Sequence, residues 1–274
     1  MGKMAVIGDI HGNRQALKAA LADIKARGCQ RTVCLGDMIA KGSFGDECVT
    51  MVKENCHVAL RGNCEDYYTN DHLPNPITEK ERARILARRA EISEENQRYI
   101  LSLPFCYEAF VSGRLLRVFH AGPDTVYDYI HTMPGATLEE RKRMFRGGSL
   151  TVSQSMADIV IYGHIHSPMM MKMMNRTLIC AGSVGNNLDL IRDAALDGNT
   201  LNTTCVNYVL IEGELDDQAL SPLSISFVQA PYDVQRELSD SRCNNPDYPA
   251  LQMELGQGLY RNMAAVAKAL DAKK

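Results

Sequence analysis

The sequence predicts an α/β fold built around a largely parallel β-sheet with helical crossovers. Within residues 1–65, three short apolar runs alternate with two amphipathic segments of helical period. This β-α-β-α-β order is typical of parallel sheets, because each crossover helix returns the chain to the same edge of the sheet. Polar clusters follow the apolar runs, at the carboxyl ends of the strands, where such folds bind ligands.

The first strands and helices are predicted from the spacing of apolar residues. The strands are KMAVIGD, RTVCLGD and HVALRGN, and the helices cover residues 13–28 and 45–55. In the first helix, Leu17, Leu21 and Ile24 fall on one face, and Gly28 ends it. The three strands therefore place three polar clusters, GDIHGN, LGDMIAKG and RGNCE, at one edge of the sheet.

Residues 79–102 are predicted to form a charged helical insertion. We expect Ile85, Leu86, Ile100 and Leu101 to face inward. Acidic residues offset the basic ones, which favours a solvated pair of helices over a role in binding nucleic acid.

The rest of the chain is predicted to complete one domain over residues 1–274. Its elements are a hairpin over 105–122 that turns at Ser112 and Gly113, a helix over 137–155, a buried strand over 157–166, a second hairpin over 169–182, a loop over 186–204, strands over 206–215 and 223–233, and a C-terminal helical extension from about residue 232 with a helix from about 248. The run MMMKMM suits a soft-metal or hydrophobic docking site. A Met-rich strand in the core or at a subunit contact, as in a homo-oligomer, is the favoured interpretation.

Composition and charge indicate a soluble cytoplasmic protein. Hydrophobic residues make up 45% of the 274 residues, and the formal net charge is -3. No apolar run approaches the ~20 residues of a membrane span, and the N-terminus shows no targeting segment. The nine cysteines lack CxxC spacing and are expected to be reduced. The negative charge argues against a nucleic-acid partner.

Seven polar residues at the ends of predicted strands form a candidate metal site. They are Asp9, His11, Asp37, Asn63, His120, His164 and His166. Imidazole and carboxylate ligands suit Mn, Fe, Zn or Co, and seven ligands suit a pair of ions better than one tetrahedral ion. Asp37 is the natural bridge, because a carboxylate has two oxygens. Two ions ~3.5–4 Å apart would activate a hydroxide for in-line attack at phosphorus.

Each motif also has a structural interpretation. Asp9 could cap the helix that starts near Asn13, and histidines at strand ends often form local hydrogen bonds. However, four of the seven histidines end predicted strands, and four unrelated structural roles explain this placement less well. The joint metal site is the stronger hypothesis.

The ordered motifs GDIHGN, LGDMIAKG, RGNCE, VFHAG and YGHIH resemble those of the calcineurin-like metallophosphoesterases. The resemblance runs from residue 4 to about 185 and looks closest to the compact bacterial phosphodiesterase and diadenosine-tetraphosphatase-like branch. It implies a four-layer α-β-β-α sandwich of two mixed β-sheets flanked by helices. It also implies two metal sites, one held by Asp9, His11, Asp37 and His166, and the other by Asp37, Asn63, His120 and His164.

Three motifs depart from that family's pattern. Ala40 and Lys41 stand where the serine/threonine phosphatases carry an Asp-Arg pair, and lysine cannot form the bidentate fork of arginine on a phosphate. This argues against a protein phosphatase. The family's NPGS is CAGS at residues 180–183, a change for which the motif suggests no mechanism.

Cys64 is the third departure. The family carries a histidine there that contacts the phosphate and helps to protonate the leaving oxygen, and Glu65 would orient it. A thiol with a pKa of ~8.5 is a weak donor, and losing a general acid costs ~10²–10⁴ in rate. The cost shrinks for leaving groups that depart unprotonated, which favours phosphodiesters and nucleotide anhydrides. A buried, purely structural Cys64 is the alternative.

The predicted function is a metal-dependent phosphoesterase that hydrolyses phosphodiester or nucleotide phosphoanhydride bonds, with Mn favoured for activity. The predicted catalytic residues are Asn63, Cys64 and His120, and the candidate phosphate contacts are Asn13, Lys41 and Arg61, although Arg61 could equally pair with an acidic neighbour. A non-catalytic binding scaffold and a nuclease are the alternatives. The seven metal ligands argue against the scaffold, and the absence of a basic, aromatic-rich stretch argues against the nuclease.

Overall fold

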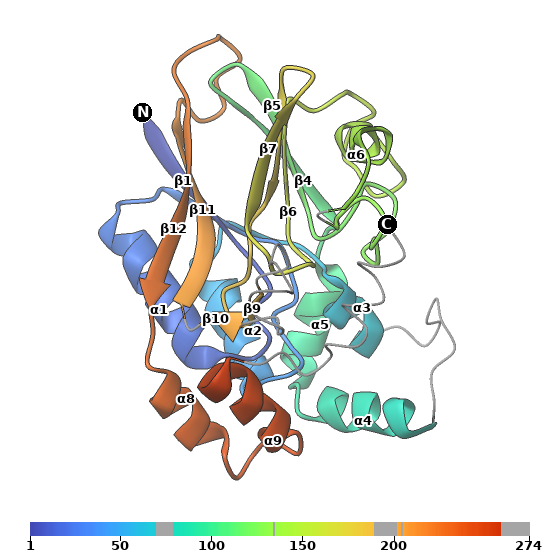
Figure 1. Ribbon diagram of the computed structural model, residues 1–274, viewed down its shortest axis with the longest axis vertical. Helices are drawn as coiled ribbons and strands as arrows, with labels where there is room; N and C mark the ends of the chain where they lie inside the picture. The colour runs from blue at the N-terminus through green and yellow to red at the C-terminus, as the bar shows by residue number, and fades with distance from the viewer. Residues whose placement is uncertain (70–78, 134, 189–201, 204, 259–274) are drawn as a thin grey trace, which may run out of the picture.

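Two mixed β-sheets of five strands each form the centre of the protein in its computed structural model (Figure 1). The structure describes residues 1–69, 79–133, 135–188, 202–203 and 205–258. The strand order is β12-β11-β1-β2-β3 in the first sheet and β4-β5-β6-β8-β7 in the second. Helices cover the outer faces of both sheets, which confirms the predicted four-layer sandwich.

The first sheet contains the predicted β-α-β-α-β unit. Its strands are β1 (Gly2–Ile7), β2 (Arg31–Cys34), β3 (Val58–Ala59), β11 (Cys205–Gly213) and β12 (Ser224–Pro231). The first three are parallel, and α1 (Arg14–Ala26) and α2 (Gly45–Asn55) connect them. β11 runs antiparallel to β1, and β12 antiparallel to β11. The carboxyl ends of β1, β2 and β3 therefore share one edge.

The second sheet contains the two predicted hairpins. Its strands are β4 (Cys106–Val111), β5 (Arg114–Phe119), β6 (Ile159–Tyr162), β7 (Met169–Met173) and β8 (Arg176–Cys180). β5, β6 and β8 are parallel, whereas β4 and β7 are antiparallel edge strands. A small separate sheet pairs β9 (Asn187–Leu188) with β10 (Asn202–Thr203), within the predicted loop over 186–204.

Alternation along the strands builds the layers. In β1, Met4 and Val6 pack between the two sheets, whereas Ala5 and Ile7 pack under the helices of the first sheet. Successive side chains of a strand point to opposite faces, so a strand buried on both faces is apolar throughout. A third apolar layer lies between the second sheet and α6 (Leu138–Phe145).

The charged insertion forms two helices, α4 (Glu79–Ala90) and α5 (Glu94–Ser102). Ile85 and Ile100 are buried as predicted, but Leu86 and Leu101 are 54% and 52% exposed. The inward prediction for these two leucines was wrong. Adjacent residues of a helix point about 100° apart, so only one of each pair reaches the core.

Two further differences concern helix limits. The predicted helix over 137–155 ends at Phe145, just before Gly147 and Gly148. A short helix, α3 (Asn63–Thr69), begins directly after β3, where the sequence suggested strand and turn. None of the described helices is both long enough and apolar enough to cross a bilayer.

The Met-rich run forms β7, as expected. Met169, Met171 and Met173 pack on the core beside α6, whereas Met170 and Met174 are about 40% exposed. The favoured interpretation, core packing, therefore holds for one face of the strand.

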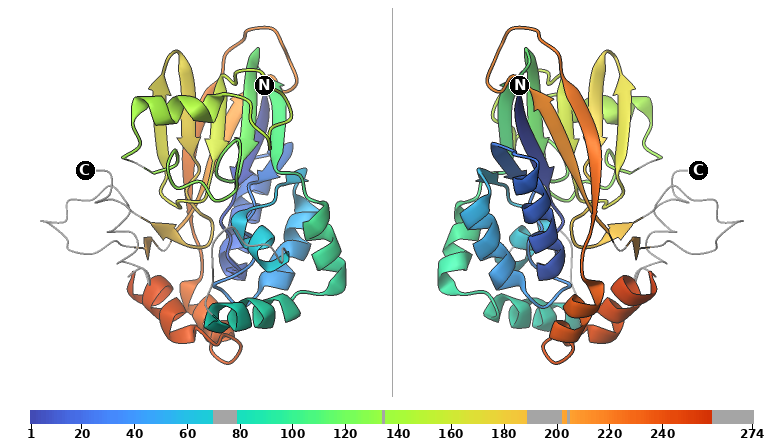
Figure 2. Two further views of the ribbon diagram at one scale, coloured as in Figure 1. Left: turned by 90° about the vertical axis from the view of Figure 1, so that its right-hand side faces the viewer. Right: turned by 90° about the vertical axis from the view of Figure 1, so that its left-hand side faces the viewer.

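The C-terminal extension folds back beneath the carboxyl ends of the parallel strands (Figures 1 and 2). It contains α8 (Val234–Ser241), α9 (Tyr248–Leu251) and a π-helical turn (Gln252–Gly256). Leu238, Leu251 and Leu255 form its small apolar core. Much of the predicted C-terminal helix, residues 259–274, lies outside the described residues.

Candidate metal centre

The structure brings the seven predicted ligands together from both sheets. Asp9 and His11 follow β1, Asp37 follows β2, Asn63 opens α3 after β3, His120 follows β5, and His164 and His166 follow β6. All of these strands present their carboxyl ends to the same end of the sandwich. Asn63 is half-buried, and the other six are buried.

Five of the seven predicted ligands adopt left-handed backbone conformations. The φ angles are 52° for Asp9, 52° for His11, 53° for Asp37, 69° for His164 and 60° for His166. Residues other than glycine rarely adopt this conformation, and it costs of order 1–3 kcal/mol at each position. Such strain gathers at functional sites, where the surrounding fold enforces it.

Two glycines allow the carboxylates to approach the neighbouring loops. A Cβ atom added to Gly62 would lie 2.3 Å from Asp37 Oδ1, and one added to Gly163 would lie 2.4 Å from Asp9 Oδ2. Either contact is far inside van der Waals distance. The glycines directly before Asn63 and His164 are therefore required by close packing against the carboxylates.

His11 and His166 face each other through their Nε2 atoms. Their Nδ1 atoms lie 3.3 Å and 2.6 Å from the carbonyl oxygens of Ile39 and Asn186. A carbonyl oxygen only accepts, so each Nδ1 donates, and the neutral form of either ring has its lone pair on Nε2. The two Nε2 atoms are 2.9 Å apart, and Asp9 Oδ1 lies 3.3 Å from that of His166.

A second group of polar side chains converges on Asn63. His120 Nδ1 donates to the carbonyl of Leu35 at 3.1 Å, which directs its Nε2 to Asn63 Oδ1 at 2.8 Å. His164 Nδ1 lies 2.8 Å from the same oxygen. Within the described part of the chain, His164 Nε2 has no hydrogen-bond partner although it is buried.

Asp37 lies between the two groups and offers one oxygen to each. Its Oδ2 is 3.7 Å from His11 Nε2, and its Oδ1 is 3.5 Å from His120 Nε2. The two carboxylate oxygens of Asp37 therefore face different groups of candidate ligands. The donor set fits divalent transition ions, because convergent lone pairs repel one another until a cation lies between them.

The electrostatics of the site favour neutral imidazoles on two of the histidines. Burial, followed by the positive charge of Lys41, lowers the pKa of His11 well below its ordinary value. Burial and the neighbouring His120 do the same to the pKa of His164. Burial opposes the charge on His120 too, but Asp37 raises its pKa overall. Neutral imidazole is the form that binds metals.

Glu65 has a role that the sequence did not predict. It accepts hydrogen bonds from the backbone N–H groups of Asp37 at 2.7 Å, Met38 at 2.7 Å, Ile39 at 3.4 Å and Gly62 at 2.9 Å. It is fully buried and joins the loop after β2 to the start of α3. Its position three residues after Gly62, as in a capping box, is the sequence signal that could have indicated this role.

Cys64 lies against the carboxylate of Asp37. Its thiol donates to Asp37 Oδ2 at 3.1 Å, and its backbone N–H donates to Asp37 Oδ1 at 2.8 Å. Burial and the charge of Asp37 raise the pKa of the thiol well above its ordinary value. Sγ is also 3.9 Å from His11 Nδ1, so it lies within reach of the first group of ligands.

Asn13 makes structural contacts with all of its amide atoms. Its Oδ1 caps α1 by accepting from the N–H of Ala16 at 3.1 Å. Its Nδ2 donates to the carbonyl of Gly185 at 3.0 Å and to the hydroxyl of Tyr232 at 3.1 Å. These contacts support a positioning role for Asn13, and phosphate contact stays a prediction.

Arg61 and Lys41 interact with different parts of the molecule. The Arg61 guanidinium lies 3.6 Å from Asp66, donates to the carbonyl of Leu101 and lies over the Phe105 ring. The acidic pairing left open by the sequence is therefore present. The positive charge of Lys41, by contrast, acts on the candidate ligands, because it helps to lower the pKa of His11 and of His164.

The loop after β8 supports the first group of ligands. Ser183 Oγ donates to the carbonyl of Asp9 at 2.6 Å and accepts from the N–H of Asn186 at 2.7 Å. Asn186 in turn binds Glu254 of the C-terminal extension at 3.0 Å. The CAGS segment thus keeps a serine that fixes the loop of Asp9, although its other changes have no structural explanation.

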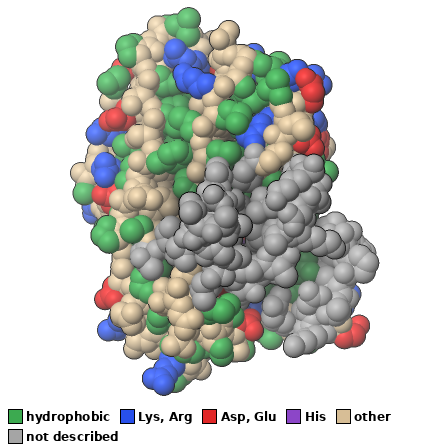
Figure 3. All heavy atoms as spheres, viewed as in Figure 1, with side chains coloured by type: hydrophobic (Ala, Val, Ile, Leu, Met, Phe, Trp, Pro, Cys, Tyr) green, Lys and Arg blue, Asp and Glu red, His purple; other side chains and the backbone are tan. Residues whose placement is uncertain are grey.

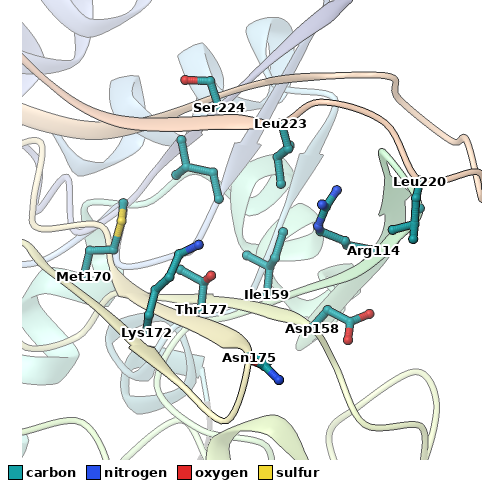
Figure 4. A pocket seen from close by; sticks show the side chains of 12 residues that line it. Arg114, Asp158, Ile159, Met170, Lys172, Asn175, Thr177, Leu220, Leu223 and Ser224 are labelled. Carbon is teal, nitrogen blue, oxygen red and sulfur yellow. The ribbon is translucent and has the colours of Figure 1, made fainter.

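A separate cavity of about 590 Å³ lies at the opposite end of the sandwich, between edge strands β7 and β12 (Figure 4). Its lining includes Asp158 and Ile159, where β6 begins, and Arg114, where β5 begins. The ligands follow the other ends of these same strands. The cavity is therefore distinct from the candidate metal centre.

A sandwich of two mixed sheets with a buried cluster of histidines and carboxylates at the strand ends defines the class of metal-dependent phosphoesterases. Residues 3–196 match the model of the calcineurin-like phosphoesterase superfamily domain. The chain belongs to this family, as its motifs predicted.

Several relatives are similar to the chain. An uncharacterized protein of Methanocaldococcus jannaschii, MJ0912, is 30% identical over 166 residues, which span 60% of this chain and 63% of that protein's length. A metallophosphoesterase from Sphaerobacter thermophilus is 21% identical, with a TM-score of 0.67 over 94% of this chain and 100% of that one. The hypothetical protein PH1004 from Pyrococcus horikoshii OT3 is 15% identical, with a TM-score of 0.67 over 92% and 97%. These two structures support the fold.

Proposed function

We propose that the protein is a cytoplasmic, binuclear metal phosphoesterase that hydrolyses phosphodiester or nucleotide phosphoanhydride bonds, with Mn²⁺ favoured for activity. All nine cysteines are free, which supports a reducing compartment. On the face drawn in Figure 3, cationic and anionic side chains are interspersed among the described residues. This mixed surface supports a small substrate rather than a long nucleic acid.

The observation that carries the proposal is the 2.9 Å contact between the Nε2 atoms of His11 and His166. Both rings already donate their Nδ1 protons to backbone carbonyls, so two lone pairs face each other. Burying this arrangement is unfavourable without a cation. In the second group, His120 Nε2 and His164 Nδ1 both face Asn63 Oδ1, and Asp37 lies between the two groups.

In the proposed mechanism, Asp9, His11, Asp37 and His166 would hold one ion, and Asp37, Asn63, His120 and His164 the other. When bound, the two ions would acidify water and neutralise charge on the phosphoryl oxygens. The carbonyls of Ile39 and Asn186 direct the Nε2 atoms of His11 and His166 into the site, so these two rings need no rotation before they bind. Lys41 adds positive charge near the site that attracts an anionic substrate.

Cys64 limits which leaving groups the site can serve. Its thiol donates to Asp37 Oδ2, and its pKa is raised by burial and by that carboxylate. A proton held this way is poorly available to a departing alkoxide. Leaving groups that depart as stable anions, such as aryl oxides and phosphates, do not need that proton, which supports the proposed substrates.

Metal content and turnover test the proposal. Protein purified without chelator should contain close to two transition ions per chain, and His166→Ala should reduce this toward one. The wild-type protein should hydrolyse bis(p-nitrophenyl) phosphate with Mn²⁺. One ion or none would contradict the binuclear centre, and absence of turnover there and on a nucleotide panel would support a binding scaffold instead.

A further inference from the structure

The loop after β5 places an aromatic side chain against one of the candidate metal ligands. The ring of Tyr129 lies 4.3 Å from the ring of His164, centroid to centroid, at an interplanar angle of 46°. Yet Tyr129 is 57% exposed, and so is its neighbour Ile130. One side of the tyrosine ring therefore lies against a candidate metal ligand, while much of the rest is open to solvent.

This loop is held in place by contacts on both sides of Tyr129. The hydroxyl of Tyr127 donates to Asp66 of α3 at 3.0 Å. Asp128 Oδ1 accepts from the backbone N–H groups of Ile130 at 2.8 Å and His131 at 3.0 Å, and Asp128 Oδ2 lies 2.6 Å from His131 Nδ1. Asp128 itself is buried. The exposed ring thus stands on a hydrogen-bonded turn.

Single exposed hydrophobic residues are common and need no explanation. Here, however, an exposed tyrosine and an exposed isoleucine are adjacent, and the tyrosine ring makes a tilted contact with His164 of the candidate metal centre. Tyrosine supplies a rigid aromatic surface with little conformational entropy to lose on binding. A substrate whose phosphate lies at the metal centre would place its neighbouring group beside this surface.

We propose that Tyr129 and Ile130 form a platform on which the base of a nucleotide substrate stacks, and that nucleotides are the preferred substrate class. The inference rests on the proposed function for the position of the phosphate. Base stacking on an aromatic side chain changes affinity by about 5- to 100-fold and tolerates any base, because every base has a π-face. The platform therefore favours substrates that carry a base, but it does not distinguish one base from another.

Binding measurements test the platform without requiring turnover. In calorimetric titrations of the Mn²⁺-loaded protein, AMP should bind at least about fivefold more tightly than ribose 5-phosphate, which lacks the base. Tyr129→Ala should abolish that difference while leaving the affinity for ribose 5-phosphate within about twofold. Tyr129→Phe should preserve it, because stacking needs the ring and not the hydroxyl. Leu220→Ala removes another exposed apolar side chain, at the distal cavity and far from the candidate metal centre, and serves as the control.

Two outcomes would overturn the inference. In one, the wild type shows no preference for AMP, whether both ligands bind or neither does. In the other, Tyr129→Ala weakens AMP and ribose 5-phosphate equally, which would indicate that the ring only supports His164. Failure of the proposed function is a different result, namely an absence of hydrolysis of bis(p-nitrophenyl) phosphate, and the preference for AMP can be measured in either case.

Discussion

The sandwich has an amino end and a carboxyl end, named for the ends of its parallel strands. At the amino end, Met174 and Asn175 adopt left-handed backbone conformations in the turn between β7 and β8. At the carboxyl end, Asp9, His11 and Asp37 adopt the same conformation in the loops that carry the candidate ligands. In the hairpin, the conformation simply reverses the chain. In the ligand loops, it turns carboxylates and imidazoles toward one point. The same backbone conformation thus forms a turn between neighbouring strands at one end, whereas at the other end it brings together side chains that are far apart in the sequence.

The two ends also differ in how their polar groups are paired. At the amino end, Asp158 accepts from Arg176 and from the N–H of Leu115, and Arg114 donates to two carbonyls. In these contacts, each acceptor meets a donor. At the carboxyl end, the nitrogen lone pairs of His11 and His166 meet each other. This pairing of one acceptor with another, more than burial or backbone strain, distinguishes the end where cations are expected to bind.

The largest effect is expected from Asp37→Asn. The change removes charge from the one residue that faces both groups of ligands, so kcat/KM on bis(p-nitrophenyl) phosphate with Mn²⁺ should fall by ~10³ or more. It should exceed the loss from any other single ligand change. Asp158→Asn, the matched carboxylate change at the amino end, should leave kcat/KM within about twofold. Comparable losses from the two variants would remove the functional distinction between the ends.

Glu65→Gln should produce the next largest effect, on stability. An amide can present only one oxygen to the four N–H groups that Glu65 binds, so the metal-free protein should lose ~2–4 kcal/mol in urea unfolding. Glu212→Gln breaks a half-exposed pair with Lys3 in the same sheet and should cost less than ~1 kcal/mol. If the two losses were equal, Glu65 would not be the link between the ligand loops.

Glu237 of the C-terminal extension should make the stability of the carboxyl end depend on pH. Glu237 is buried against α1, where it accepts from the N–H of Gln15 at 3.0 Å, and burial raises its pKa from 4.5 to about 7. The folded chain therefore holds this proton more tightly than the unfolded chain. The stability it contributes is fully present below pH ~4.5 and is lost as pH rises through about 7, by up to ~3 kcal/mol.

Urea unfolding at pH 5 and pH 8 tests this dependence. Glu237→Gln should reduce the stability lost between those pH values. Asp216→Asn is the control, because its hydrogen bond with Arg31 lowers the pKa of Asp216 and moves its titration to acid pH. An unchanged slope in Glu237→Gln would show that the carboxyl is already ionised in the folded protein at pH 5.

Cys64→His should give the smallest effect. A histidine beside Asp37 could protonate an alkoxide leaving group, so the ratio of phosphomonoesterase to phosphodiesterase activity should rise by ~10-fold. Cys243→His changes an exposed cysteine and should leave the ratio unchanged. If Cys64→His raised both activities equally, the leaving-group argument would be wrong.

The local pattern of the sequence was enough to predict several features. Apolar runs of strand length, followed by Asp9, Asp37 or His164, indicate both the strands and the candidate ligands, because residue chemistry and period are visible along one dimension. The sequence was less able to predict which face of a helix is buried. Ile85 and Leu86 are equally apolar neighbours, and only packing on the core decided which one is buried.

By itself, the sequence determined the α/β class, the family and the seven residues that converge, since motif order and strand ends are properties of short segments. Only the tertiary structure decided that Glu65 joins two ligand loops, that Asn13 is committed to α1, and that Tyr129 stands exposed over His164. The physical reason is separation along the chain. His11 and His166 are 155 residues apart, so the contact of their nitrogens depends on how the two sheets pack.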